Sequence, residues 1–512
     1  MIPFVLLIGG IDSSGGAGLV QDTRGVQAYG LHAAVATTLV SSQSHTKTTE
    51  VMPVATSLFA EQLDAAFSLA SPRAIKIGAL ANAEQVAVVV DKLKVHPTIP
   101  VVWDPVQTTS SDVPLGILTP DTAAALLPHV TVLTPNINEL GTITGLPVNT
   151  NKSQLIAAHN LLAYGCQYVL VKGGHQQNRT VTDTLYYAES TWHFTHQQKA
   201  SFSLRGSGCL LATAIASGLA TGYDPEDAVC QAEAVIAYAF EHAMKIDDAI
   251  GAATSVAVPH SHSYYPRVYR DFTDVSDLPA FPPLDYSSPG LYPVVDSVEW
   301  LARLLPLGIR IIQLRLKRSE HSVQNIYSAI KQAVALAKNY ATQLFINDHW
   351  EQAIEHGAYG VHLGQSDLNH ANLHRIASAG LRLGVSTHGY AELCRGLTLR
   401  PSYIALGHVY PTQTKNMPSS PQGPVRLAKY TALCGNTPTV AIGGIKLHNL
   451  DEVLGAKVSS VAVVTAITNS HAPTDVVRQF QQRIQQGQQT DAAVASLPCQ
   501  SPILPVTASE PC

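Results

Sequence analysis

The sequence lacks the features that would place it in several large classes of protein. Only 13% of its 512 residues are charged and the formal net charge is −5, so no basic surface for a nucleic acid is indicated. No apolar run is long enough to cross a bilayer, and the apolar start from Met1 to Ile8 has neither a basic lead nor a cleavage site. We therefore expect neither a nucleic acid nor a membrane among its partners.

Cysteine is scarce and irregularly placed. The cysteines are odd in number, widely spaced and form no CxxC pair, which argues against a disulfide framework and against a zinc site. This pattern predicts a protein of the reducing cytoplasm. The seven residues are Cys166, Cys209, Cys230, Cys394, Cys434, Cys499 and Cys512.

The length predicts at least two domains, because 512 residues exceed what one hydrophobic core usually holds. Residues 251–289 are rich in proline, serine and aromatic residues and lose the apolar periodicity, which predicts a linker. Residues 486–512 consist largely of Gln, Ala, Ser and Pro, which predicts a disordered tail. The predicted domains are therefore residues 1–250 and 290–485.

The C-terminal half alternates short apolar strands with stretches long enough for a helix, such as Ile326 to Lys338. Eight such units predict a parallel (β/α)8 barrel of the TIM type, whose chemistry lies at the carboxyl ends of its strands. The predicted strands are residues 291–295, 309–316, 344–346, 360–363, 383–385, 403–406, 439–442 and 460–464.

The N-terminal half also alternates strands and helices, but a glycine-rich turn from Gly9 to Gly18 follows its first strand, Phe4 to Ile8. Such a turn ahead of a helix can bind phosphate through backbone N–H groups. The pattern predicts a doubly wound α/β domain rather than a second barrel. The other predicted strands are residues 74–77, 101–103, 130–133 and 168–172.

A second glycine-rich helix start, Gly206-Ser207-Gly208-Cys209, precedes small and apolar residues that predict a buried helix. The helix dipole favours an anion at this start, and the same field is expected to lower the pKa of the Cys209 thiol. Cys209 is therefore a candidate proton acceptor or transition-state contact. Small buried cysteines are also frequent structural residues, so the motif alone does not decide between the two.

Polar residues end three other predicted strands of this half. Asn136 and Glu139 offer an amide and a carboxylate where magnesium and nucleotide phosphates would lie. Lys172 offers a cation for phosphate, and Asp104 ends a third strand. Each residue type is also common in caps and turns. Their coincidence at strand ends nevertheless favours a binding site.

Together these motifs resemble the hydroxymethylpyrimidine and phosphomethylpyrimidine kinases of the ribokinase-like family, over residues 1 to about 250. The resemblance implies two successive phosphorylations of a pyrimidine alcohol by ATP with Mg²⁺. It implies catalysis by Lys172 and by Cys209, which stands where other ribokinase-like enzymes carry an aspartate. The other implied contacts are Asn136, Glu139, Gly206 and Gly208 for phosphate and nucleotide, and Gly10, Asp12 and Gln43 for the pyrimidine.

The chain departs from this family in the substrate pocket. Ala79 and Gln107 stand where the family usually has methionine, and the family's pyrimidine-contacting glutamine aligns with either Ser42 or Gln43. Pyridoxal-type alcohols stay open as side substrates, because ribokinase-like pockets differ by few residues. The alternative for this half is a degenerate pyrimidine-binding or regulatory module that does not catalyse.

The predicted barrel carries its own charged strand ends. Gln313, Arg315 and Lys317 alternate, so strand geometry predicts that all three face the barrel mouth, where two cations require an anion. Asp348 and Asp367 end neighbouring strands and predict a magnesium site that bridges a diphosphate. The later loops add two hydroxyls, a cation and the phosphate cradle common in such barrels. These residues are Thr412, Thr414, Lys415, Gly443, Gly444, Val464 and Thr465.

Over residues 290 to 470 this pattern resembles thiamine phosphate synthase, including the segments 347–348, 364–367 and 384–386. The resemblance implies coupling of hydroxymethylpyrimidine diphosphate to hydroxyethylthiazole phosphate with release of pyrophosphate. The implied catalytic residues are Arg315, Lys317 and Lys415. The implied contacts are Gln313, Arg315, Lys317, Asn347, Ser386 and Lys415 for the pyrimidine diphosphate, and Thr412, Thr414, Gly443, Gly444, Val464 and Thr465 for the thiazole phosphate.

This coupling demands no general base, because an aminopyrimidine stabilises the cation left when pyrophosphate departs. We therefore assign none to His349, which replaces a common aspartate, or to His362. The product of the first domain would be the substrate of the second, which supports both assignments. A thiazole tautomerase is the rival interpretation of the barrel, and the paired aspartates argue against it. The sequence leaves a homo-oligomer open.

Overall fold

The computed structural model describes residues 3–108, 113–173, 180–188, 190–197, 202–271, 277–412 and 420–495. By its internal contacts the chain divides into two units. The first comprises residues 1–280, 387–400 and 432–435, and the second comprises residues 281–386, 401–431 and 436–512. No helix among the described residues is both long enough and apolar enough to cross a membrane.

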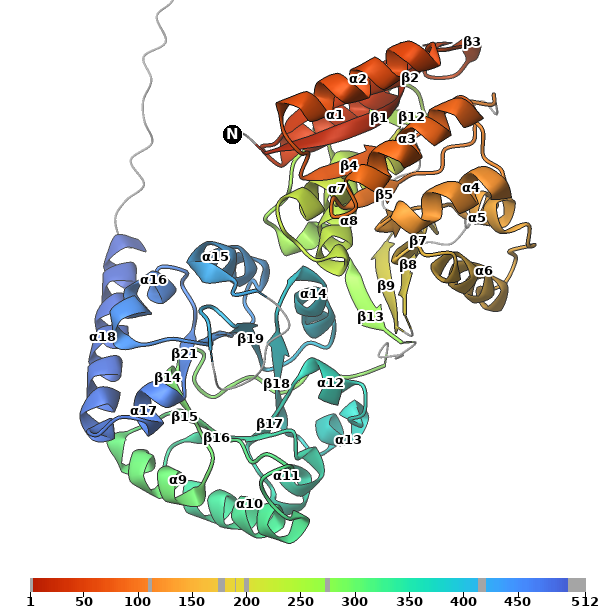
Figure 1. Ribbon diagram of the computed structural model, residues 1–512. Helices are drawn as coiled ribbons and strands as arrows, with labels where there is room; N and C mark the ends of the chain where they lie inside the picture. Colours follow the sequence, from red (N-terminus) through yellow and green to blue (C-terminus); the bar gives the residue numbers. More distant parts are fainter. Residues whose placement is uncertain are drawn as a thin grey trace, which may run out of the picture. The chain divides into compact units, whose positions relative to one another are not determined.

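A ten-stranded sheet in the order β13-β9-β8-β7-β6-β5-β4-β1-β2-β3 forms the first unit (Figure 1). Strand β1 pairs in parallel with both β2 and β4, so the strand order reverses at β1. The strands are β1 (Phe4–Asp12), β2 (His32–Gln43), β3 (Thr48–Pro53), β4 (Ala74–Ile77), β5 (Val101–Trp103), β6 (Val132–Leu133), β7 (Tyr168–Val171), β8 (Thr180–Tyr187), β9 (Ser190–Gln197) and β13 (Arg267–Arg270). A separate small sheet joins β10 (Ser203–Arg205), β12 (Ile250–Ala252) and β11 (Met244–Lys245).

Helices cover this sheet through alternating strand residues. Phe4, Leu6 and Ile8 of β1 belong to one buried cluster with residues of α2 to α6, whereas α7 contacts β1, β4, β5 and its neighbours α1 and α8. The helices are α1 (Gly18–Ala28), α2 (Thr56–Leu69), α3 (Ala83–Val95), α4 (Pro120–Leu126), α5 (Ile137–Thr144), α6 (Asn151–Ala163), α7 (Ser207–Ala220) and α8 (Pro225–Glu241).

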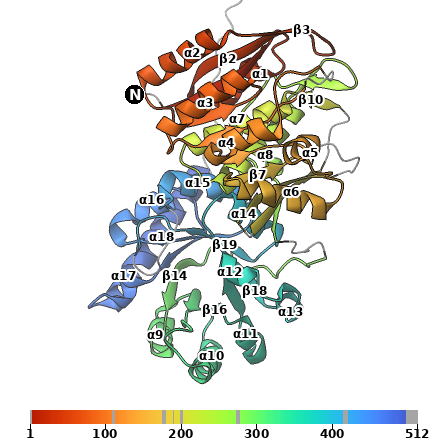
Figure 2. The same ribbon diagram turned by 45° about the vertical axis from the view of Figure 1, so that its right-hand side comes forward.

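The second unit contains a closed barrel of eight parallel strands, as predicted, with α9, α10 and α11 outside the ring of strands (Figure 1 and Figure 2). The strands are β14 (Gly290–Val295), β15 (Ile311–Leu314), β16 (Gln343–Asn347), β17 (Gly360–Leu363), β18 (Arg382–Thr387), β19 (Tyr403–Gly407), β20 (Thr439–Ile442) and β21 (Ser460–Val463). The helices that follow them are α9 (Val298–Leu304), α10 (Val323–Ala337), α11 (Trp350–His356), α12 (Gln365–Leu368), α13 (Leu373–Ser378), α14 (Tyr390–Thr398), α15 (Gly423–Leu433), α16 (Leu450–Leu454), α17 (Thr465–Thr468) and α18 (Pro473–Ala495).

Two predicted boundaries are wrong. Part of the expected linker forms β13, which pairs antiparallel with β9 because Val268 finds a buried position there at 1% exposure. The expected tail begins too early, since α18 continues to Ala495. Its residues Val477, Phe480 and Ile484 are buried at helical spacing, and the glutamines that follow are good helix formers. Residues 496–512 lie outside the described residues.

Replacing Val268 by Asp tests whether β13 is part of the folded sheet. A carboxylate at this buried position has no partner, so we expect a loss of roughly 3 kcal/mol or more in the free energy of unfolding. Thermal unfolding followed by circular dichroism measures the loss. The control is Arg267→Asp, which places the same side chain on the exposed neighbouring residue. Equal and small effects of the two substitutions would show that this segment is a linker after all.

Candidate active sites

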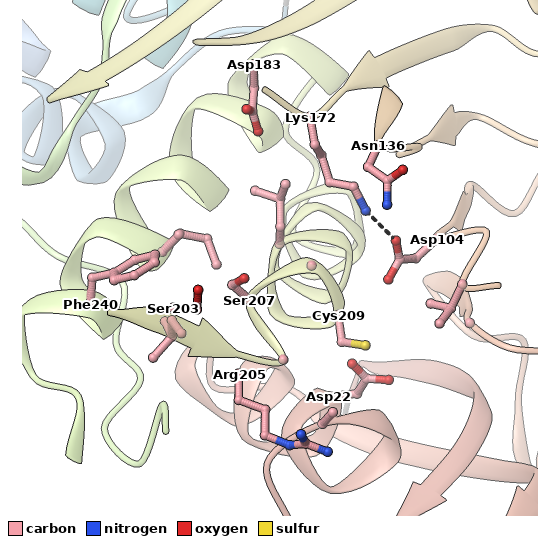
Figure 3. A pocket seen from close by; sticks show the side chains of 18 of the residues that line it. Asp22, Asp104, Asn136, Lys172, Asp183, Ser203, Arg205, Ser207, Cys209 and Phe240 are labelled. Carbon is pink, nitrogen blue, oxygen red and sulfur yellow. Dashed lines mark hydrogen bonds and ion pairs between the residues drawn. The ribbon is translucent and has the colours of Figure 1, made fainter. Parts of the chain in front are cut away.

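A cavity of about 1430 Å³ lies where the parallel strands of the first unit end. Its wall combines the glycine-rich turn after β1, the ends of β4 to β7 and the start of α7 (Figure 3). Both departures from the family pattern, Ala79 and Gln107, also line it. The predicted residues in its wall are Gly10, Asp12, Gln43, Asn136, Glu139, Lys172, Gly206, Gly208 and Cys209.

The cavity also decides between the two alignments of the pyrimidine-contacting glutamine. Gln43 lines the cavity, and its side chain accepts a hydrogen bond from the Ser41 hydroxyl at 3.1 Å. Ser42 is exposed, and its hydroxyl accepts a hydrogen bond from Thr49 at 2.8 Å. The pairing of β2 with β3 is irregular between these two residues, and of the two only Gln43 lines the cavity. Gln43 is therefore the residue placed to meet a ligand.

Lys172 is the central cation of this cavity. Its Nζ lies 2.9 Å from Asp104 Oδ1 and 3.7 Å from Glu139 Oε2, as Figure 3 shows for Asp104. Burial opposes the charge of Lys172, but the two carboxylates raise its pKa above the ordinary value. A Cβ at Gly208 would lie 3.5 Å from this ammonium, so the first turn of α7 faces the same point. An ammonium and free helix N–H groups that converge in this way are suited to bind phosphate.

Asn136 and Glu139 form a capping box at the start of α5. The Glu139 N–H donates to Asn136 Oδ1 at 2.9 Å, and the Asn136 N–H donates to Glu139 Oε2 at 2.7 Å. The residues thus serve as a helix cap, the role that sequence reasoning weighed against ligand binding. Burial raises the pKa of Glu139, although the ammonium of Lys172 partly opposes this.

The expectation that the helix start lowers the pKa of Cys209 is wrong. Burial raises the pKa of this thiol to about 12, and the nearby carboxylates of Asp22 and Asp104 add to the effect, while Lys76 only partly offsets it. Desolvation at this wall outweighs the field of the helix, although the Cys209 side chain is only half-buried. Burial therefore favours the neutral thiol of Cys209, which argues against the predicted role of proton acceptor.

Sequence reasoning missed a buried ion pair in the wall of the cavity. Lys76 Nζ lies 2.8 Å from Asp22 Oδ2, and the Thr213 hydroxyl donates to Asp22 Oδ1 at 2.7 Å. The side chains of Lys76 and Asp22 are 1% and 0% exposed. This contact ties β4, α1 and α7 together under the phosphate site. The signal in the sequence was an aspartate on the buried face of the first helix, which only a tertiary partner can explain.

Two glycines are required where the first turn meets α7. Gly18 has φ +60° and a Cβ there would lie 2.3 Å from Gly10 O, whereas Gly206 has φ +72° and its Cβ would lie 2.3 Å from Gly16 O. Beside them Asp12 Oδ2 lies 3.2 Å from Arg205, and its other oxygen accepts from the backbone N–H of Ser14 at 2.8 Å. Asp12 thus braces the turn while it lines the cavity.

A second acidic group in this cavity was also missed. Asp183 accepts a hydrogen bond from the Gly173 N–H at 2.8 Å, one residue beyond Lys172. Burial and the neighbouring Glu233 raise the pKa of Asp183 well above its usual range, and burial raises that of Glu233 to about 7. His196 Nε2 lies 3.4 Å from Glu233 Oε2. The two carboxylates come from β8 and α8, so no sequence motif links them.

In the barrel, a smaller cavity of about 310 Å³ brings together five predicted residues. The prediction that Arg315 and Lys317 lie on a strand is wrong, because β15 ends at Leu314. Arg315 and Lys317 therefore belong to the following loop and do not alternate along a strand. Lys317 forms an exposed ion pair with Glu320 at 2.6 Å. The five residues are Arg315, Lys317, Asn347, Asp348 and Asp367.

Asp348 occupies a tight turn between β16 and α11. Its φ is +62°, which is unusual for a residue other than glycine, and its backbone N–H donates to His362 O at 3.0 Å. His349 Nε2 lies 2.9 Å from Leu316 O, so this histidine links the turn to the loop that carries Arg315. No group of three or more His, Cys, Asp or Glu able to hold a metal occurs in the described part of the chain.

The other described residues predicted for the barrel site are not among those that line this smaller cavity. Gln313 is buried and donates to the Tyr292 hydroxyl at 3.3 Å, and Ser386 Oγ lies 2.8 Å from His362 Nε2. Thr414 and Lys415 lie outside the described residues. Gly443 and Gly444, with φ of +103° and +67°, allow close contact with residues 408–411, and Val464 precedes α17, which begins at Thr465. Thr412 follows β19 without regular structure.

The acidic pair in the first cavity predicts a specific dependence of stability on pH. An acid whose pKa is higher in the folded state than in the unfolded chain binds more protons when folded, so stability falls as the pH rises from about 4.5 toward 7. The fall is at most about 1.4 kcal/mol per pH unit for each group. Glu233→Gln should therefore unfold at a higher temperature than the wild type at pH 8, with the gain disappearing near pH 5.

Glu61→Gln, on an exposed position of α2, is the matched control and should leave the pH profile unchanged. Parallel profiles for the wild type and Glu233→Gln would show that Glu233 is ionised in the folded state like an ordinary surface carboxylate.

Comparisons with known proteins match the two halves separately. Residues 12–254 match the family model described as phosphomethylpyrimidine kinase, and residues 291–467 match the one described as thiamine monophosphate synthase. The thiamine-phosphate synthase of Serratia proteamaculans (strain 568) is 56% identical over 181 residues, which are 35% of this chain and 84% of that relative.

Solved structures match the first half. A pyridoxal kinase from Staphylococcus aureus in complex with ADP is 28% identical with a TM-score of 0.45, covering 53% of this chain and 99% of its own. A phosphomethylpyrimidine kinase from Clostridium difficile 630 is 29% identical with a TM-score of 0.40, covering 46% and 99%. From the family models and the curated relative, the chain belongs to the thiamine-phosphate synthase family and carries a phosphomethylpyrimidine kinase domain in the same chain, which makes it a bifunctional transferase of thiamine biosynthesis.

Proposed function

We propose that the two units act in series on one pyrimidine. The first unit phosphorylates hydroxymethylpyrimidine and then its monophosphate with ATP, and the barrel joins the diphosphate to hydroxyethylthiazole phosphate and releases pyrophosphate. The observation that carries this proposal is that each unit has a cavity at its strand ends where cations meet carboxylates, Lys172 with Asp104 in one and Arg315 near Asp348 in the other. Phosphoryl groups need such neutralisation.

In the kinase unit, we assign Lys172 and the first turn of α7 to the transferred phosphoryl group. The ammonium and the N–H groups of Gly208 and Cys209 are placed to neutralise charge that spreads over the phosphoryl oxygens. The carboxylates of Asp104 and Glu139 face the same cavity and fit a magnesium ion that arrives with ATP. Magnesium would supply further neutralisation of the phosphates. Gly10, Asp12 and Gln43 would contact the pyrimidine from the opposite wall.

In the barrel, we assign Asp348 and Asp367 to one magnesium ion. Two carboxylates without a third protein ligand fit magnesium, which usually completes its shell with water and substrate phosphates. Arg315 and Lys317 would bind the leaving pyrophosphate, and Asn347 would orient it. The proposed contacts with the rest of the pyrimidine diphosphate are Gln313, Ser386 and Lys415. The proposed contacts with the thiazole phosphate are Thr412, Thr414, Gly443, Gly444, Val464 and Thr465.

Several coarser features support this assignment. We propose that the first unit is doubly wound, because its strand order reverses at β1 and helices pack on alternating strand residues. We propose a cytoplasmic enzyme, since the described cysteines Cys166, Cys209, Cys230, Cys394 and Cys434 are free thiols. The domains would then be residues 1–271 and 281–495, after correction for β13 and α18.

The role of Cys209 can be tested by comparing the two phosphorylations. The first nucleophile is an alcohol that must lose a proton, whereas the second is a phosphate oxygen that need not. A protonated thiol only contacts the transition state, so Cys209→Ala should slow both steps by a similar factor of roughly ten. Single-turnover rates for each step measure this. Cys166→Ala, at a buried thiol away from the cavity, is the control. A loss confined to the first step would show that Cys209 acts as a proton acceptor after all.

Two complementary variants test whether the units act in series. Lys172→Met should lower formation of thiamine phosphate from free pyrimidine at least ~100-fold and leave the reaction with pre-made diphosphate intact. Asp348→Asn should abolish formation of thiamine phosphate both from free pyrimidine and from pre-made diphosphate. It should still allow the pyrimidine to be phosphorylated. Thiamine phosphate is followed by fluorescence after oxidation.

Mixing the two variants should restore product, because each retains one working unit and the diphosphate can diffuse between chains. If the wild type forms thiamine phosphate only from pre-made diphosphate, the first unit is a binding module and the kinase assignment is wrong.

A further inference from the structure

A continuous run of hydrogen bonds crosses the interior of the barrel. Gln313 Nε2 donates to the Tyr292 hydroxyl at 3.3 Å, and the hydroxyls of Tyr292 and Tyr403 lie 2.8 Å apart. The Tyr403 hydroxyl lies 2.7 Å from His362 Nδ1, and His362 Nε2 lies 2.8 Å from Ser386 Oγ. We call these five side chains the hydroxyl relay. It joins two residues assigned to the pyrimidine diphosphate, Gln313 and Ser386.

The relay is held in a closely packed interior. Tyr292 and Tyr403 are 1% and 0% exposed, and Gln313 and His362 are 4% and 6% exposed. A Cβ added at Gly384 would lie 2.4 Å from the Tyr403 hydroxyl oxygen. The glycine two residues before Ser386 therefore makes room for this tyrosine. The Gly-Val-Ser motif thus places a small residue beside the relay and a hydroxyl at its end.

Hydrogen counting gives the relay one direction. Tyr292 already accepts from Gln313, so its own hydrogen must go to Tyr403. Tyr403 then donates its hydrogen to His362 Nδ1. A neutral His362 whose Nδ1 accepts carries its hydrogen on Nε2 and donates it to Ser386. The hydroxyl hydrogen of Ser386 is then directed away from the relay.

The opposite direction fails at Tyr292. If Ser386 donated to His362 and Tyr403 donated to Tyr292, Tyr292 would accept twice and its own hydrogen would have no acceptor among the hydrogen bonds of its hydroxyl. A buried hydroxyl hydrogen left without an acceptor is strongly unfavourable, because its hydration is lost and not replaced. Burial raises the pKa of both tyrosines, so both hydroxyls keep their hydrogens at neutral pH.

We propose that Tyr292, Tyr403 and His362 are positioning residues that fix the half-buried Ser386 as a hydrogen-bond donor to an acceptor atom of the pyrimidine diphosphate. Ser386 is further held by Gln365, whose Nε2 donates to its backbone oxygen at 2.7 Å. Suitable acceptors are a ring nitrogen of the pyrimidine or an oxygen of the diphosphate. This inference rests on the proposed contact of Ser386 with that substrate.

The test is a double-mutant cycle on the full chain supplied with pre-made pyrimidine diphosphate and thiazole phosphate. Ser386→Ala should lower kcat/KM about tenfold. Tyr403→Phe should lower it to a similar extent, because the donor to His362 Nδ1 is lost and the other imidazole tautomer can then accept from Ser386. The double variant should be no worse than the poorer single variant. Tyr359→Phe removes a tyrosine hydroxyl of the same barrel that donates to Gln343 instead, and should leave kcat/KM unchanged.

Nitrogen-15 NMR of the histidine-labelled enzyme provides a second readout, with the His362 signals assigned through His362→Asn. We expect an unprotonated Nδ1 and a protonated Nε2 in the wild type, and loss of this preference in Tyr403→Phe. Losses that multiply in the double variant, or a hydrogen on Nδ1 of His362 in the wild type, would overturn the relay. An unchanged Ser386→Ala variant would contradict the contact of Ser386 with substrate, and a wild type inactive on pre-made diphosphate would contradict the proposed function itself.

Discussion

The direction of parallel strands is the constraint on which both sites depend. In each unit, residues far apart in the sequence end neighbouring strands at the same edge of a sheet, so their polar side chains meet there. Lys172 reaches Asp104 because β7 and β5 both pair in parallel with β6 and therefore end at the same edge of the sheet. Arg315 shares a cavity with Asp348 because β15 and β16 are parallel neighbours. Antiparallel pairing would have sent one member of each pair to the opposite edge.

Burial then decides what these charges can do. Lys76 and Lys172 are both enclosed, and each is matched by a carboxylate within 3 Å, because an unpaired ion there would cost several kilocalories. The pairs differ in exposure, since Lys76 is 1% exposed and Lys172 is 15% exposed. Lys76 is fixed among α1, β4 and α7, whereas Lys172 is the more exposed of the two and lies beside the first turn of α7. Cys209 lines the same cavity, and there desolvation raises the pKa of its thiol and favours the neutral form.

Much of this arrangement could be predicted from the sequence, and what could not depends on tertiary context. All eight barrel strands were predicted because short apolar runs and turn residues are local signals. The pKa of Cys209 was predicted in the wrong direction, because the helix start is visible in the sequence but the loss of water around the thiol is not. The choice between Ser42 and Gln43 required the cavity itself, which only Gln43 of the two lines. The partners Asp183 and Glu233 stand on β8 and α8, and only the fold brings the two carboxylates to one cavity.

The hydroxyl relay shows the same limit most clearly. Its members stand on β14, β15, β17, β18 and β19, and only closure of the barrel brings them together. Barrel interiors are usually filled by branched aliphatic side chains, and here Phe345 and Val440 still fill much of the core. Each buried hydroxyl in such a core needs a hydrogen-bond partner, and here Tyr292 and Tyr403 are partners of each other while His362 links Tyr403 to Ser386. Gly384 leaves the space that the Tyr403 side chain occupies. The hydrogen-bond direction of Ser386, two residues later, is set by Tyr403 through His362 and not by a residue of its own strand.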